Sequence, residues 1–191
     1  ATRRRIKLSI SGHKLLKMKR DGLIIEFFEI LPKVKDMRSQ LVNLYTVADK
    51  KLAVAMVADG KSALRSAANC VRTPPQVELS EYNIMGVVVP KIKVSTIQKS
   101  VEERGYGLIG TSVRIDESVH AFEKLAEKVL EAAELETTMK KLLDEIESTK
   151  RRVNALEFKV IPQLEEVAAY ITLRLEELER ENVFRLKRIK A

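Results

Sequence analysis

The chain of 191 residues has little of what most folds use to turn or to cross-link. It contains one cysteine, no tryptophan, seven glycines, five prolines and only 5% aromatic residues. The single Cys70 cannot form an intramolecular disulfide and fits a reducing compartment. One cysteine and two histidines exclude a Cys/His structural zinc site. So few turn-forming residues exclude collagen-like and turn-rich all-β proteins.

Long hydrophobic runs are also missing from the sequence. No apolar run approaches the ~18 residues that a membrane-spanning helix needs, and no N-terminal stretch has the apolar centre of a signal peptide. We therefore expect no direct membrane insertion. Apolar residues make up 45% of the chain and charged residues 32%, which argues against intrinsic disorder and favours long helices.

The net charge of +8 is concentrated at the two ends of the chain. Residues 1–20 contain eight basic residues and no acid, and Arg185, Lys187, Arg188 and Lys190 form a second basic cluster. Such clusters can be solvated helix ends, or they can contact nucleic acid, anionic lipid or an acidic partner. The charge pattern leaves these alternatives open.

Two long segments have apolar residues at alternating steps of three and four, which is the heptad pattern of a coiled coil. In the first segment this seam consists of Leu23, Phe27, Ile30, Val34, Met37, Leu41 and Leu44. In the second it includes Ile146, Val153, Leu156, Val160, Leu164, Val167 and Ile171. Each helix alone would expose its seam, so we expect the two to pair.

The predicted fold is therefore mainly α: a long antiparallel two-helix coiled coil with a small middle region that contains a short β-hairpin. We expect an N-terminal helix over 1–70, an irregular middle over 71–115 and a C-terminal helix over 116–191. If the chain reverses near residue 93, position i faces roughly position 186 − i. Both basic clusters would then lie at the same end.

The prolines and the middle region give finer predictions. Pro32 and Pro162 predict a kink or local break within each helix, unless the helices end there. The β-branched stretch Asn83–Val89 predicts a strand, and the glycine-flanked stretch Tyr106–Ile109 is its candidate partner. Thr111 or Ser112 is expected to cap the following helix.

Two segments resemble phosphate-binding loops, but the residues around them do not fit such a loop. Gly105–Gly110 has the glycine spacing of a dinucleotide-binding loop, but neither a buried strand before it nor a second parallel strand after it. Gly60-Lys61-Ser62 resembles the end of a phosphate-binding loop, but position 55 is alanine where that loop needs glycine. His13 and His120 have no second ligand at metal-binding spacing. We expect no catalytic residue, no cofactor and no metal.

Several segments resemble a known family. Gly12–Asp21, Gly86–Pro90, Lys150–Glu157, Val160–Pro162 and Glu179–Lys190 are similar to the D-subunit family, the rotor stalks of V-type and archaeal A-type ATPases. The resemblance covers nearly the whole chain in the family's order. Its most specific parts are Arg-Arg-Val-Asn-Ala-Leu-Glu within Lys150–Glu157 and Phe-Arg-Leu-Lys-Arg-Ile-Lys within Glu179–Lys190.

The resemblance implies a non-catalytic axle of a rotary motor at the cytoplasmic face of a membrane. Its partners would be a hexamer of ATPase A and B subunits around the terminal helices, the F subunit along the stalk, and an adaptor protein on the membrane ring. The residues that we then expect to contact the hexamer are Arg3, Arg4, Arg5, His13, Lys14, Lys17, Phe184, Arg185, Lys187 and Arg188.

The alternative function is a nucleic-acid-binding or tethering coiled coil that uses its basic ends; a membrane-surface adaptor is a third possibility. The basic residues are not interleaved with aromatics, and no groove-reading module is visible. The related gamma subunit of F-type rotors also pairs two terminal helices. It carries an α/β domain between them, for which a middle of ~45 residues is short.

Overall fold

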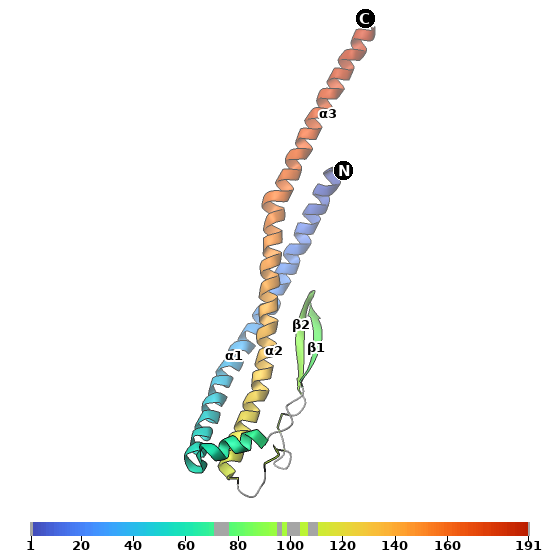
Figure 1. Cartoon of the computed structure of the whole chain (residues 1–191). Helices are drawn as coiled ribbons and strands as arrows, with labels where there is room; N and C mark the ends of the chain where they lie inside the picture. Colours follow the sequence, from blue (N-terminus) through green and yellow to red (C-terminus); the bar gives the residue numbers. More distant parts are fainter. Residues whose placement is uncertain (1, 71–76, 95–96, 99–103, 107–110, 191) are drawn as a thin grey trace. The chain divides into compact units, whose positions relative to one another are not determined.

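A computed structural model describes residues 2–70, 77–94, 97–98, 104–106 and 111–190. In chain order the elements are α1 (Thr2–Cys70), β1 (Val77–Ile84), β2 (Val87–Val94), α2 (Val113–Ala155), the π-helical turn η2 (Leu156–Val160) and α3 (Ile161–Lys190) (Figure 1). They form two compact units: Ala1–Ile25 with Asp144–Ala191, and Glu26–Leu143.

Within the unit Glu26–Leu143, α1 and α2 pair in antiparallel orientation. Val34 and Leu41 of α1 line one small crevice together with Ala132 of α2. Further along α1, Lys51 Nζ lies 4.0 Å from Glu117 Oε2, close to the start of α2. Later residues of α1 thus face earlier residues of α2.

Within the unit Ala1–Ile25 with Asp144–Ala191, the same antiparallel arrangement holds. His13 Nε2 lies 3.4 Å from Glu157 Oε2, and Lys19 Nζ donates a hydrogen bond of 2.8 Å to Glu145 Oε1. Val153 lies between these two ion pairs along the chain and is 2% exposed. The predicted fold class, a mainly helical antiparallel coiled coil with a β-hairpin in its middle, is confirmed.

The predicted register of the helix pair is wrong. With a reversal near residue 93, His13 would face about residue 173 and Lys19 about residue 167, whereas their partners are Glu157 and Glu145. The physical reason is a break at Gly60, whose φ of 81° and ψ of 155° are not helical. The break takes the last ten residues of α1 out of the line of the helix, so the pairing begins earlier than the sequence suggested. Figure 1 shows the sharp change of direction in the teal part of α1.

The two internal prolines have different outcomes. The helix continues through Pro32, so neither a break nor a helix end occurs there. At Pro162 the α-helical pattern is interrupted by η2, in which the Ile161 N–H bonds to the Leu156 carbonyl. Proline has no N–H and crowds the carbonyl four residues earlier, here that of Phe158. The wider π-helical turn accommodates this and lets the helix continue.

The β-hairpin lies at other residues than predicted. The stretch Asn83–Val89 is not one strand but contains the turn between β1 and β2, which pair antiparallel from Val77 opposite Val94 to Ile84 opposite Val87. Met85 and Gly86 both have positive φ, as a type I′ turn requires, and Asn83 Oδ1 accepts a hydrogen bond from the Gly86 N–H. Tyr106, the first residue of the expected partner strand, lies in a bend; residues 107–109 lie outside the described residues.

The hairpin docks along α2 through its second strand. The Ile92 N–H donates a hydrogen bond of 2.8 Å to Glu134 Oε2, and Lys141 Nζ donates one of 2.9 Å to the Val88 carbonyl. Val87 and Val89 are buried, because alternate residues of β2 point inward. No helix in the described part of the chain is long and apolar enough to span a membrane.

Candidate functional site

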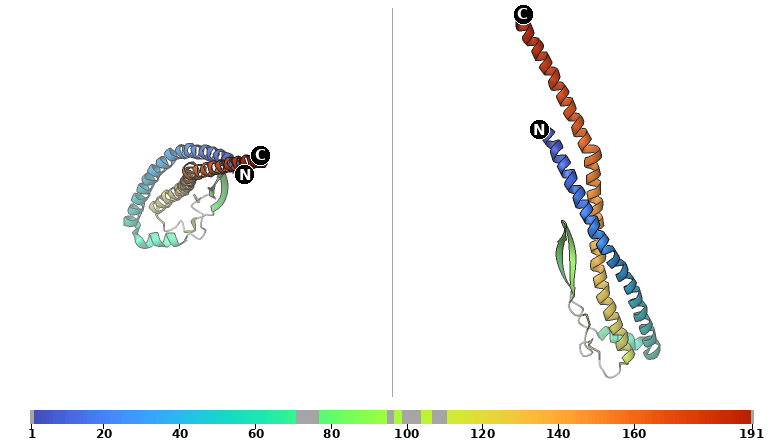
Figure 2. Two further views of the ribbon diagram at one scale, coloured as in Figure 1. Left: turned by 90° about the horizontal axis from the view of Figure 1, so that it is seen from above. Right: turned by 180° about the vertical axis from the view of Figure 1, so that it is seen from behind.

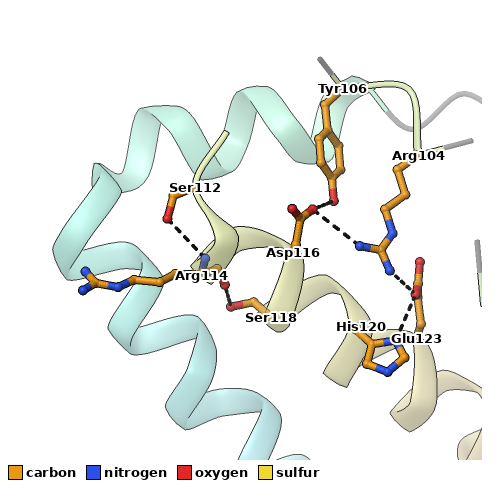
Figure 3. Close-up of polar contacts among 8 residues, drawn as sticks. All are labelled: Arg104, Tyr106, Ser112, Arg114, Asp116, Ser118, His120 and Glu123. Atoms are coloured by element: carbon orange, nitrogen blue, oxygen red, sulfur yellow. Dashed lines mark hydrogen bonds and ion pairs between the residues drawn. The ribbon is translucent and has the colours of Figure 1, made fainter. Parts of the chain in front are cut away.

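A cluster of charged side chains closes the end of the helix pair near the start of α2 (Figure 3). Arg104 donates hydrogen bonds from Nη1 to Asp116 Oδ1 at 3.5 Å and from Nη2 to Glu123 Oε2 at 2.9 Å. The Tyr106 hydroxyl donates to the same Asp116 oxygen at 2.7 Å. His120 Nδ1 lies 3.9 Å from Glu123 Oε2. We call Arg104, Tyr106, Asp116 and Glu123 the clasp.

The clasp is largely shielded from water. The side chain of Arg104 is 7% exposed and that of Glu123 is 12% exposed. Arg104 Nε is buried and has no hydrogen-bond partner in the described part of the chain. Burial raises the pKa of Tyr106, and its hydrogen bond to Asp116 raises it further. Tyr106 thus stays a neutral donor over a wide pH range, and the Arg104 cation is paired with two carboxylates.

The start of α2 positions the acids of the clasp. Ser112 caps the helix as predicted: its Oγ accepts a hydrogen bond from the Arg114 N–H at 3.2 Å. Asp116 lies in the first turn of the helix, where the helix dipole favours a negative charge. Glu123 lies two turns further along the helix and on the same face, so one arginine can reach both carboxylates.

A small apolar core supports the clasp. Tyr106 packs in one cluster with Ala55, Ala67 and Ile115. Gly105 has a φ of +79°, and a Cβ there would lie 2.7 Å from the Cys70 carbonyl oxygen. Only glycine fits this position, because the backbone conformation and the close approach both exclude a side chain. The core and the clasp together fix the end of α1 against the start of α2.

The predicted seam residues are placed at different depths. Leu23 and Val34 are buried in α1, and Val153 is buried in the other helix. The half-buried ones are Phe27, Ile30, Met37, Leu41, Leu44, Ile146, Leu156, Val160 and Leu164. Val167 is 49% exposed and Ile171 is 41% exposed. Packing therefore weakens after Leu164.

Among the described residues, the C-terminal part of α3 has no helix packed against it. Every side chain from residue 169 to residue 189 is exposed, although the apolar pattern continues through Leu175 and Leu178 to Ile189. At 1.5 Å per residue this stretch is about 30 Å long. The right-hand view of Figure 2 shows the red end of α3 continuing past the N-terminus. The continuing apolar stripe marks a surface suited to contact another protein.

The residues that we expected to contact the hexamer do not lie together at one position along the helix axis. Arg3, Arg4, Arg5, Lys14, Lys17, Phe184, Arg185, Lys187 and Arg188 are all exposed. In the observed register Arg3 faces the region of Val167 rather than Val183, so the two basic clusters are separated by roughly 25 Å along the helices. His13 is half-buried and paired with Glu157.

The clasp was not predicted from the sequence. Arg104 comes from the predicted irregular middle, whereas Asp116 and Glu123 come from the start of the predicted C-terminal helix, and a heptad pattern predicts no contact between the two segments. Charged residues are also common in this chain. The available signal was Gly105, a glycine between two large polar residues beside a predicted helix start. In the described part of the chain no three His, Cys, Asp or Glu side chains lie close enough together to hold a metal ion.

The comparisons with known proteins identify the family of the chain. The family model for the D subunit of ATP synthase matches residues 1–191. The D subunit of the A-type ATP synthase of Methanococcoides burtonii is 60% identical over 188 residues, which cover 98% of this chain and 91% of that protein. The D subunit from Methanosarcina mazei is 58% identical and covers 99% of this chain and 90% of its own length. The one from Archaeoglobus fulgidus is 54% identical, with 98% and 90% covered. The chain therefore belongs to the D-subunit family of ATP synthases.

Proposed function

We propose that the chain is the central axle of an A-type ATP synthase and carries torque between the A/B hexamer and the membrane ion-translocating ring. The observation that carries this proposal is the pairing of two long helices, followed by the exposed apolar stripe of α3. A two-helix rod resists twisting better than a single helix. Its exposed end offers a surface to an enclosing partner.

In this proposal the chain is non-catalytic and needs no cofactor. The ATPase A and B subunits would surround the terminal helices, and the exposed basic residues of both clusters would face their inner lining. The F subunit and the ring adaptor would bind elsewhere on the stalk, which makes the chain a peripheral component at the cytoplasmic face of the membrane. The three segments 1–70, 71–115 and 116–191 are the proposed functional divisions.

The observed register allows the two basic clusters to be tested separately. One variant neutralises Arg3, Arg4 and Arg5, and another neutralises Arg185, Lys187 and Arg188. A matched control neutralises Lys33, Lys35 and Arg38, which are also exposed cations of α1. We expect both terminal variants to weaken binding to a purified A/B hexamer and to flatten its salt dependence, while the control and binding to the F subunit stay unchanged.

Other outcomes would contradict the proposal. A wild-type chain that does not bind the hexamer is not its axle. Salt-sensitive retention on DNA without hexamer binding would support the nucleic-acid alternative instead. Equal hexamer affinity and equal salt dependence in all variants would contradict the proposed role of the basic clusters and show that they are merely solvated.

A further inference from the structure

Three polar side chains of α2, spaced by seven residues, bind the part of the chain that precedes the helix. Glu134 and Lys141 bind the backbone of the hairpin strand β2. Glu127 Oε2 accepts a hydrogen bond of 3.1 Å from Gln98 Nε2. Seven residues are close to two helical turns, so the three side chains lie on one face of α2. We call Glu127, Glu134 and Lys141 the latch residues.

The latch residues cover the outer edge of β2. In a hairpin with a two-residue turn, the residues that flank the turn, Ile84 and Val87, exchange hydrogen bonds, and every second pair from there does the same. The Val88 carbonyl and the Ile92 N–H therefore point away from β1, and these are the two groups that the latch residues bind. Pro90, which lies between them, has no N–H to leave unpaired. A strand edge that would otherwise be open is thus capped by side chains of a helix.

Apart from the latch residues, little holds the hairpin on the helix. Val87 and Val89 are its only buried side chains among those described, and no residue of β1 is buried. The hydrogen bonds of Lys141 and Glu127 are exposed to water, where polar contacts contribute little to stability. In the clasp, by contrast, Arg104 is 7% exposed and bound to two carboxylates. The clasp is therefore held more firmly than the hairpin.

The pairing of the two strands does not depend on α2. Each strand has eight residues, and all of them are paired with the other strand. Tyr82 lies opposite Val89, and Glu78 lies opposite Lys93. An aromatic residue opposite a β-branched one, and two opposite charges, both stabilise a pair of strands. These contacts lie inside the hairpin and would move with it.

We propose that the latch residues make the hairpin a releasable arm, which undocks from α2 as a unit while the clasp and the pairing of α1 with α2 stay intact. Undocking uncovers Val87, Val89 and the outer edge of β2. A partner that binds these groups in only one of the two states shifts the balance between the states. This motion belongs to the chain itself and does not depend on the axle role.

The test compares the E134A/K141A variant of the full chain with the matched control E136A/K140A. Glu136 and Lys140 are exposed on α2 and take part in no ion pair or side-chain hydrogen bond within the described part of the chain. Both variants replace one acid and one base by alanine, so net charge and helix propensity change alike. Circular dichroism and thermal unfolding report whether the helices are intact, and we expect them to be so in both.

Amide hydrogen exchange distinguishes undocking from the loss of a single hydrogen bond. Lys141 binds the Val88 carbonyl and does not touch the Ile92 N–H, so faster exchange at Ile92 in K141A reports undocking. We expect exchange at Ile92 to be at least about twofold faster in K141A and unchanged in K140A. The Val89 N–H, which pairs with β1, should keep its exchange rate in both variants.

A distance measurement reports the motion itself. Spin labels are attached to cysteines placed at Leu79, which is 72% exposed on β1, and at Val129, which is 47% exposed on α2, in a Cys70→Ser background. Double electron–electron resonance should show one distance in the wild type. In E134A/K141A we expect a second, longer distance, with the ratio of undocked to docked chains raised at least about tenfold. The control should match the wild type.

Three results would overturn the proposal. Unchanged exchange at Ile92 in K141A together with an unchanged distance in E134A/K141A would mean that the latch residues do not hold the hairpin. Exchange at Val89 that accelerates as much as exchange at Ile92 would mean that the hairpin unfolds and does not move as a unit. A loss of helix content in E134A/K141A but not in its control would mean that the latch residues support the helix pair.

Discussion

The clasp can be compared with the terminal helix pair, by which we mean the pairing of Ala1–Ile25 with Asp144–Ala191. Both use ion pairs between a basic and an acidic side chain, but in different surroundings. In the clasp, Arg104 and Glu123 are 7% and 12% exposed, whereas Lys19 and Glu145 in the helix pair are 31% and 26% exposed. A buried cation is costly once its partners are lost, while a half-exposed pair can fall back on water. The clasp thus determines the local path of the chain, and the terminal pairs only help to fix a register that apolar burial stabilises.

The largest effect is expected where apolar burial dominates. Val153→Asp places a carboxylate at a site that is 2% exposed and should lower the free energy of unfolding by about 4 kcal/mol. Val167→Asp, at a site 49% exposed, should cost less than about 1 kcal/mol. Urea unfolding followed by circular dichroism measures both. Equal losses would mean that the helix pair does not end where the structure places it.

The next effect concerns the clasp. Arg104→Ala leaves Glu123 and Asp116 without their cation and should destabilise the chain by about 3 kcal/mol. Arg114→Ala, an exposed arginine in the same turn of α2 as Asp116, serves as the control and should change stability by less than about 0.5 kcal/mol. A similar small change in both variants would show that the clasp is no stronger than a surface pair.

Glycine substitutions give effects of opposite sign in the two regions. Gly105→Ala forces a Cβ to within 2.7 Å of the Cys70 carbonyl oxygen at a positive φ and should cost about 2 kcal/mol. Gly12→Ala lies in a helix with nothing within 4 Å of the new Cβ and should stabilise by about 0.5–1 kcal/mol. Thermal unfolding of the two variants gives the signs. Stabilisation by Gly105→Ala would contradict the close approach at the clasp.

The smallest effect is a pH dependence in the terminal helix pair. The hydrogen bond from Lys19 lowers the pKa of Glu145. The ionised carboxylate therefore stabilises the fold above its unfolded pKa of about 4.5, and this contribution is lost as the pH falls through the lower folded value. Glu145→Gln should be less stable than wild type at pH 7 and equal to it near pH 3.

Its control is Glu166→Gln, an exposed glutamate that takes part in no ion pair within the described residues. It should differ little from wild type at either pH. A loss for Glu145→Gln that stays constant with pH would mean that the charge of Glu145 is not what the pair uses.

Periodic features of the fold could be predicted from the sequence, whereas among the local ones the Ser112 cap was predicted and the register and the hairpin turn were not. The heptad steps through Leu23, Val34 and Val153 depend only on helix geometry, so both long helices and their pairing followed from the pattern. The register did not, because one glycine among seven, Gly60, ends the straight part of α1, and its only local signal is the turn-favouring dipeptide Asp59-Gly60 inside a strongly helical segment. The hairpin turn was missed because methionine is an unusual residue at the positive φ of Met85.

The clasp lay beyond prediction for a different reason. Arg104 reaches Asp116 and Glu123 across separations of 12 and 19 residues, and no periodicity connects them. In a chain with 27 acidic residues, the sequence does not show which carboxylate an arginine will choose. The exposed residues of both basic clusters were correctly predicted to be helical, but their separation depended on the register.

The most direct test of the axle role is to observe rotation. The A/B hexamer is fixed to a surface, and a bead is attached to the chain through a cysteine placed at Leu79, which is 72% exposed on the hairpin, in a Cys70→Ser background. The proposal predicts that the bead turns in one direction when ATP is added and stops when ATP is removed. A bead that stays still while the same complexes hydrolyse ATP would contradict it.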